Sequence, residues 1–151
     1  MNQFDKRRHE LFIEIGDHRK MVLSTASVTR VTSRMMSIIC IDGQFLFQTD
    51  QRSRKSIQLR VNPQASLCFD NLQIEGICRE IGHPDNHPAF CALYEKYFPS
   101  AYRRYTHLED ERLFVLEPEY IKKWVYVDGE PFEEIWDFAK NNYELLKYIQ
   151  R

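Results

Sequence analysis

The amino-acid sequence predicts a mainly β fold, in which six or so antiparallel strands close into a small barrel with peripheral helices. Strand-like segments follow one another directly with one short helix among them, whereas a parallel α/β fold would alternate strands and helices. Asp42-Gly43 is a typical hairpin turn, and Asp128-Gly129 indicates another turn. The chain has 151 residues, 43% of them hydrophobic, with ten Phe and eight Tyr. We therefore expect one domain, residues 1–151, with a sizeable core.

The first half of the chain predicts an N-terminal helix and five strands, besides the short helix described below. Phe4, Leu11, Phe12 and Ile15 share one face of a helix that ends at Gly16. The expected strands are residues 21–25, 34–41, 44–49, 65–69 and 74–81. The segment 34–41 is almost continuously apolar, so we expect it to be covered on both faces. Gly76 indicates a bulge or a close backbone approach within the last of these strands.

The second half predicts helices at 89–98 and 101–107, separated by Pro99, and then strands at 113–116 and 120–127. Tyr94, Tyr97 and Tyr105 either line a substrate pocket or pack these helices onto the barrel. A final helix at 133–148 is predicted from helical spacing. The residues with this spacing are Ile135, Phe138, Ala139, Leu146 and Ile149.

Composition limits the classes of partner. A net charge of −1 gives no overall basic field, so we expect no nucleic-acid binding. The four cysteines form no C-x-x-C pair and are expected to be reduced and buried. No apolar run reaches the length of a membrane span and the charged N-terminus is no signal peptide, so we expect a cytoplasmic protein without membrane contact. His83, Asp85 and His87 lie among prolines, which favours a loop over a metal site.

Residues 43–63 predict a strand, a polar turn and a short helix that ends at Asn62-Pro63. Ser53 is a natural N-cap, and Arg52, Arg54 and Lys55 surround it. Backbone N–H groups, the helix dipole and these cations together suit a phosphate, although a solvated basic turn is the alternative. The five glycines are scattered, so no glycine-rich loop can hold the phosphate and side chains must do so.

The spelling Thr49-x-x-x-Ser53-Arg54-Lys55-x-x-Gln58-x-x-x-Asn62-Pro63 resembles the phosphate-binding segment of the pyridoxamine 5'-phosphate oxidase family, which are FMN-binding split β-barrel proteins. In that family the Ser-Arg-Lys group holds the FMN phosphate. The segment beginning at Arg34 resembles a strand along the flavin edge, although Ile39 replaces the family's lysine. The cofactor-binding residues implied by the resemblance are Arg34, Met35, Met36, Ser37, Gln48, Thr49, Ser53, Arg54, Lys55, Asn71 and Trp124.

Two of these residues rest on weaker parts of the resemblance. Asn71, five residues before Gly76, is the nearest match to a glutamine that reaches the flavin from the partner subunit. Trp124 lies in a segment similar to the family's Pro-x-x-Ile-x-x-Trp, and a core position is the alternative. True pyridoxamine phosphate oxidases follow this segment with Arg-x-His, which holds the substrate phosphate. Residues 125–130 contain neither residue.

The resemblance implies an FMN-dependent oxidoreductase that acts on a small molecule as a homodimer, with NAD(P)H as the candidate electron donor. It is closer to nitroimidazole-resistance reductases and general-stress flavoproteins than to true vitamin B6 oxidases. No side chain is assigned as a general acid or base, because a flavin carries the chemistry itself. The alternatives are a non-catalytic flavin or haem carrier or redox sensor on the same fold, and a purely structural dimer.

Overall fold

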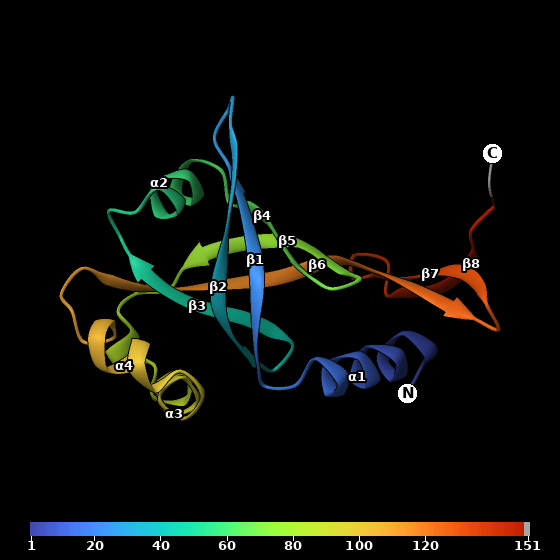
Figure 1. Ribbon diagram of the computed structural model, residues 1–151, viewed down its shortest axis with the longest axis horizontal. Coiled ribbons are helices and arrows are strands. Elements are labelled where there is room, and N and C mark those ends of the chain that lie inside the picture. The colour runs from blue at the N-terminus through green and yellow to red at the C-terminus, as the bar shows by residue number, and fades with distance from the viewer. Residues whose placement is uncertain (150–151) are drawn as a thin grey trace.

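The computed structural model describes residues 1–149 and forms a closed antiparallel barrel with a two-stranded extension (Figure 1). The strands are β1 (His18–Ala26), β2 (Val31–Ile41), β3 (Gln44–Asp50), β4 (Gln64–Phe69), β5 (Leu72–Glu80), β6 (Glu111–Val127), β7 (Glu130–Asp137) and β8 (Asn142–Lys147). Their order is β3-β2-β1-β4-β5-β6-β7-β8, and pairing of β3 with β6 closes the first six into a barrel. The predicted mainly β barrel is confirmed.

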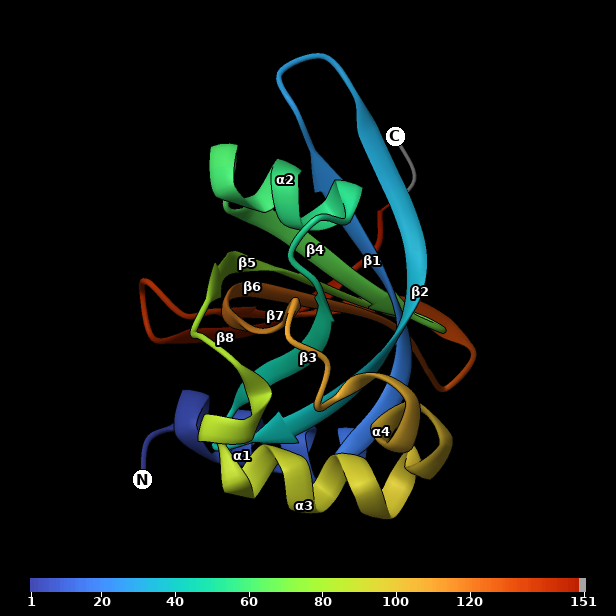
Figure 2. The same ribbon diagram turned by 90° about the vertical axis from the view of Figure 1, so that its left-hand side faces the viewer.

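The helices lie around this barrel: α1 (Gln3–Ile15), α2 (Arg54–Val61), α3 (Pro88–Tyr97) and α4 (Pro99–Tyr105). As expected, α1 buries Phe4, Leu11 and Ile15 and ends at Gly16, whose φ is +82°. In Figure 2, α2 and the α3–α4 pair lie at opposite ends of the barrel. No helix of the described residues is long and apolar enough to cross a bilayer.

The core consists of two clusters of buried side chains. The larger fills the barrel, where Phe47 and Phe114 stack with ring centroids 5.4 Å apart. The smaller lies beneath α3, where Phe90 packs with Ile39 of β2. The α3–α4 segment therefore closes one outer face of the barrel. All four cysteines are free, but Cys68 is exposed on β4, so the prediction that all four are buried is wrong.

Strand β2 is covered on both faces only in its second half. Ile38 and Ile39 point to opposite faces, and both are fully buried. Val31 is 71% exposed and Met35 is 60% exposed, contrary to the expectation for the whole strand. Val31 lies in the part of the β1–β2 hairpin that projects beyond the barrel, past α2 (Figure 2), whereas Met35 points to the outer face of β2, opposite to Met36, which packs on the core.

The barrel bends at Gly76, where the register between β5 and β6 shifts. A Cβ atom at this position would lie 2.2 Å from the carbonyl oxygen of Glu117, which confirms the predicted bulge with close backbone approach. Pro118 lies opposite Gly76 at the same irregularity. Because proline is tolerated at a bulge, β6 runs through as one strand where two were predicted.

The predicted helix at 133–148 is wrong. These residues form most of β7 and β8, which turn at Asn141, whose φ is +48°. Trp136 of β7 pairs with Tyr143 of β8, and both rings are buried against the barrel core. Pairing of β7 with the long strand β6, together with burial of Trp136 and Tyr143, outweighs the helical spacing of the apolar residues.

Candidate cofactor-binding site

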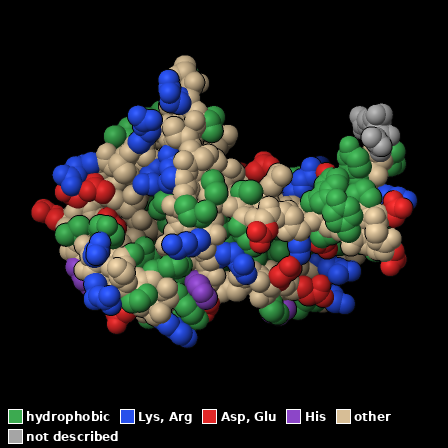
Figure 3. Space-filling model, in the orientation of Figure 1, with side chains coloured by type: hydrophobic (Ala, Val, Ile, Leu, Met, Phe, Trp, Pro, Cys, Tyr) green, Lys and Arg blue, Asp and Glu red, His purple; other side chains and the backbone are tan. Residues whose placement is uncertain are grey.

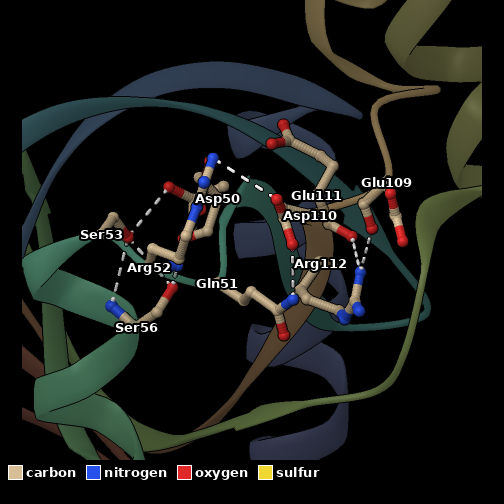
Figure 4. A network of polar contacts seen from close by, with 10 residues as sticks. Asp50, Gln51, Arg52, Ser53, Ser56, Glu109, Asp110, Glu111 and Arg112 are labelled. Carbon is tan, nitrogen blue, oxygen red and sulfur yellow. Dashed lines mark hydrogen bonds and ion pairs between the residues drawn. The ribbon is translucent and has the colours of Figure 1, made fainter.

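The β3–α2 turn presents the N-terminus of a capped helix. Ser53 Oγ accepts a hydrogen bond from the backbone N–H of Ser56 at 3.4 Å, and Ser56 Oγ donates to the carbonyl of Asp50 at 2.8 Å (Figure 4). Ser53 is therefore the N-cap, as predicted. The other N–H groups of a first helical turn have no intrahelical acceptor, and the dipole makes this end positive. The turn is suited to an anion.

Three cationic side chains meet at this helix end. Lys55 donates from Nζ to Thr49 Oγ1 at 3.0 Å, and Arg34 reaches the same region from β2. Burial and the charge of Arg54 lower the pKa of Arg34, while burial and the charge of Arg34 lower the pKa of Lys55. Such mutual repulsion is relieved when an anion binds. Figure 3 shows Lys and Arg side chains gathered over α2 and the β1–β2 hairpin.

These three cations form no ion pair among the described residues, although the charges of Glu111 and Asp50 act on Lys55 from farther away. Among residues 1–149, none of the ion pairs includes Arg34, Arg54 or Lys55. Arg52 behaves differently, because it pairs with Asp50 at 2.8 Å and with Asp110 at 3.4 Å. Its hydrogen bonds lower the pKa of Asp50 to about 2. Arg52 therefore ties the turn to the start of β6, and the cationic cluster consists of the other three residues (Figure 4).

The matched strand residues differ in where their side chains point. Thr49 contacts Lys55 of the cationic cluster, whereas Gln48 donates from Nε2 to the buried carboxyl of Glu111 at 2.8 Å. On β2, Met35 is exposed and Met36 packs against the barrel core. Ser37 lies beside the hydroxyl of Tyr94, whose pKa is raised to about 12 by burial.

Asn71 and Trp124 lie apart from this cluster. They bond each other, since the Asn71 amide donates to the Trp124 carbonyl and the Trp124 N–H donates to the Asn71 carbonyl at 3.1 Å. Asn71 comes directly after the last residue of β4. Arg34 lies near the other end of this strand, because it contacts Thr25, which pairs with Ala65 at the beginning of β4. Within one chain the structure does not bring these two residues to the cations.

The aromatic helices mainly pack onto the barrel. Tyr97 stacks on His18 with ring centroids 3.6 Å apart and donates to Asp17 at 3.0 Å. Tyr94 is 5% exposed and stacks on Phe90. Of the three tyrosines considered as pocket residues, Tyr105 alone has a largely exposed side chain. The packing interpretation therefore holds for Tyr94 and Tyr97.

The sequence analysis missed the residues that surround Arg34. Its guanidinium donates to the hydroxyls of Thr25 at 2.7 Å and Thr32 at 2.6 Å, and both hydroxyls contact Gln58 of α2. One signal was present in the sequence, because Gln58 is a position of the matched motif, and the structure shows that this polar side chain is buried on α2. A buried polar residue of this kind requires partners.

A family model described as pyridoxamine 5'-phosphate oxidase matches residues 7–125 of the chain. A pyridoxine/pyridoxamine 5'-phosphate oxidase from Acidothermus cellulolyticus is 46% identical over 50 residues, which are 32% of this chain and 22% of that protein. The matched segment is thus a minor part of that relative.

Solved structures share the fold at low identity. A pyridoxamine 5'-phosphate oxidase-related, FMN-binding protein from Nostoc punctiforme has a TM-score of 0.65 at 16% identity, over 97% of this chain and 93% of that chain. General stress protein 26 from Bacillus anthracis has a TM-score of 0.59 at 21% identity, over 85% and 98%. The haem storage protein HutZ from Vibrio cholerae has a TM-score of 0.59 at 17% identity, over 78% and 88%. The family model covers most of the chain and the barrel agrees with these structures, so the chain belongs to the pyridoxamine 5'-phosphate oxidase family.

Proposed function

We propose that this protein is an FMN-dependent oxidoreductase that acts on a small molecule, with the FMN phosphate bound by Arg34, Ser53, Arg54 and Lys55. The observation that carries the proposal is a group of three cations at the N-terminus of α2, none of which forms an ion pair within residues 1–149. A phosphate monoester carries nearly two negative charges at neutral pH, which such a group neutralises.

The donor types match a phosphate. Arg34 and Arg54 offer planar N–H forks for paired oxygens, Lys55 offers a point charge, and the helix end offers backbone N–H groups. Thr49 holds the Lys55 ammonium in place through its hydroxyl. When bound, FMN would supply hydride chemistry, and the chain would supply binding and orientation. The similar structure from Nostoc punctiforme is that of an FMN-binding protein, which supports this choice of cofactor.

We place the remainder of the site on a second copy of the chain. Asn71 and Trp124 lie away from the cations of their own chain. Exposed apolar side chains on β2, such as Met35, offer a surface for a partner. A homodimer would allow the far end of one barrel to cover a flavin whose phosphate is bound by the other.

A carrier without turnover is the second candidate, because similar structures include haem-binding and haem storage proteins. Haem carries carboxylates, which the same cations could bind. The two candidates differ in the cofactor that stays bound to the protein and in whether a nicotinamide cofactor reduces it. A flavin carrier would bind FMN but resist reduction by nicotinamide cofactors.

An absorbance spectrum of the freshly purified protein separates these functions. The proposal predicts the absorbance bands of a bound flavin. If the purified protein lacks them, they should appear after the protein is incubated with FMN and desalted. Anaerobic addition of NADH or NADPH should then bleach the flavin bands faster than those of free FMN. A Soret band with no flavin uptake would favour the haem carrier, and colourless protein that ignores FMN would contradict both functions.

A further inference from the structure

Gln58 joins α2 to the β1–β2 hairpin through a buried hydrogen-bond network. Its side-chain oxygen, Oε1, accepts from the Thr25 hydroxyl at 2.5 Å and from the Thr32 hydroxyl at 2.8 Å. The same hydroxyls accept from Arg34, which donates from Nη1 to Thr25 and from Nη2 to Thr32. Gln58 is 6% exposed and Thr25 is 1% exposed, so water competes little for these bonds.

The donor and acceptor chemistry fixes the direction of the bonds that join Arg34 and Gln58 to the two threonines. Arginine can only donate, so each threonine hydroxyl must use a lone pair for Arg34. Each hydroxyl then has one proton left to donate, and the Gln58 oxygen has two lone pairs to receive both protons. Removing that oxygen frees both protons to rotate toward Arg34, which would weaken its hold on the two hydroxyls.

The network also determines which edge of Arg34 remains available. A guanidinium has five N–H groups. Nη1 donates to the Leu23 carbonyl at 3.3 Å and to Thr25, and Nη2 uses one N–H for Thr32. Among the contacts of residues 1–149, this leaves the Nε–H and the second N–H of Nη2. These two groups lie on one edge of the planar group, the arrangement that binds two phosphate oxygens.

We propose that Gln58 is a positioning residue of the phosphate site. Through Thr25 and Thr32 it fixes the plane of the Arg34 guanidinium, so that the free edge meets the helix end that carries Ser53 and Lys55. Because Gln58 lies on α2 itself, it holds the two halves of the site in one geometry. This inference rests on the proposed function, since the anion concerned is the phosphate of FMN.

The test compares FMN with riboflavin, which lacks the phosphate, by quenching of flavin fluorescence. Gln58→Met keeps the length of the side chain but removes the oxygen. We expect the Kd for FMN to rise about tenfold, as for one charge-assisted hydrogen bond, with the Kd for riboflavin unchanged. In an Arg34→Ala background the same substitution should have no further effect on FMN binding, because Gln58 acts through Arg34.

Ser24→Ala is the matched control. It removes a hydroxyl that bonds Ser33 at 2.8 Å on the same hairpin, outside the Arg34 network, so the Kd for FMN should stay unchanged. The positioning role would be overturned if Gln58→Met raised the Kd for FMN and the Kd for riboflavin equally. It would also be overturned if the effects of Gln58→Met and Arg34→Ala on the free energy of FMN binding were additive. If Gln58→Met does not fold, Thr32→Val breaks the network from the strand side and is judged by the same comparisons.

The outcome separates this inference from the proposed function. Wild-type protein that does not bind FMN, or binds it as weakly as riboflavin, contradicts the phosphate site and with it the role of Gln58. FMN binding that is weakened by Arg34→Ala but not by Gln58→Met or Thr32→Val overturns the role of Gln58 alone.

Discussion

The side-chain amide of Gln48 donates a hydrogen bond to the buried carboxyl group of Glu111 at 2.8 Å. The amide oxygen of Gln48 accepts in turn from the Thr106 hydroxyl at 2.8 Å, so strand β3 is bonded to both ends of the segment that leads into β6. Burial raises the pKa of Glu111 to about 7, and the charge of Asp50 acts in the same direction. The Gln48 hydrogen bond and the charges of Lys55 and His83 oppose this rise.

We expect this carboxyl group to make the free energy of unfolding depend on pH. The folded protein retains the proton of Glu111 up to about pH 7, whereas the unfolded chain loses it near the ordinary value of 4.5. The folded state therefore binds more protons between these values, and the free energy of unfolding should fall as pH rises through this window. Glu111→Gln keeps an acceptor for Gln48 and should flatten this dependence.

Urea denaturation below, within and above the window measures the effect. Glu109→Gln is the matched control, because Glu109 is an exposed carboxyl on the same turn. Equal slopes of unfolding free energy against pH in wild type and Glu111→Gln would show that Glu111 is not the titrating group.

Gly76→Ala should destabilise the barrel strongly. The added Cβ would lie 2.2 Å from the Glu117 carbonyl oxygen, so the backbones of β5 and β6 must separate at the bulge. We expect a loss of about 3 kcal/mol in the free energy of unfolding. Gly82→Ala, where a Cβ meets nothing within 4 Å but φ is +100°, should cost only about 1 kcal/mol of backbone strain. Thermal or urea denaturation of both variants checks the order, and a smaller loss for Gly76→Ala would contradict it.

The fold was predictable where local signals and pairing agree. The hairpin of β2 and β3 was found because Asp42-Gly43 supplies the turn and apolar runs flank it. The C-terminal hairpin was missed because Ile135 and Phe138 also fit a helical period. The decisive interaction there is pairing of β7 with β6, between residues on separate strands, which no local pattern records.

The candidate phosphate site was predictable from the sequence where its residues lie close together in the chain. Thr49, Ser53 and Lys55 follow from one short segment, because capping and helix-end electrostatics act within a single turn. The hydrogen-bond network around Arg34 could not be predicted from the sequence, because it joins Gln58 to Thr25 across 33 positions of the chain. Contacts of this kind depend on how α2 packs onto the β1–β2 hairpin.

We expect negligible oxidation of pyridoxamine or pyridoxine 5'-phosphate. The family's Arg-x-His for the substrate phosphate is replaced by residues 125–130, which include Asp128 and Glu130. Asp128 and Gly129 form the exposed turn between β6 and β7, with φ of +51° and +82°. Loss of two phosphate partners removes several kcal/mol of binding. An oxidase assay that finds turnover of about one per second or faster would contradict this.

We expect the protein to be a C2 homodimer with a large interface. Val31 and Met35 on β2 and Leu145 and Leu146 on β8 expose apolar side chains. A dimer that brings such surfaces together should bury more than about 2,000 Å², which is typical of obligate interfaces. Light scattering at micromolar concentration should give twice the 18.2 kDa of one chain. A monomer would count directly against this arrangement, and Met35→Glu should promote the monomer if β2 lies in the interface.

The central claim is that Arg34, Arg54 and Lys55 bind the phosphate of FMN, and the Kd for FMN in Lys55→Ala and Arg34→Ala tests it most directly. One charge-assisted contact to phosphate is worth about 1.5–3 kcal/mol, so each variant should bind FMN about tenfold to a hundredfold more weakly than wild type. Arg52→Ala is the control, because Arg52 is already paired with Asp50 and Asp110. It should leave the Kd within about twofold of wild type. Unchanged FMN affinity in both Lys55→Ala and Arg34→Ala would contradict the claim.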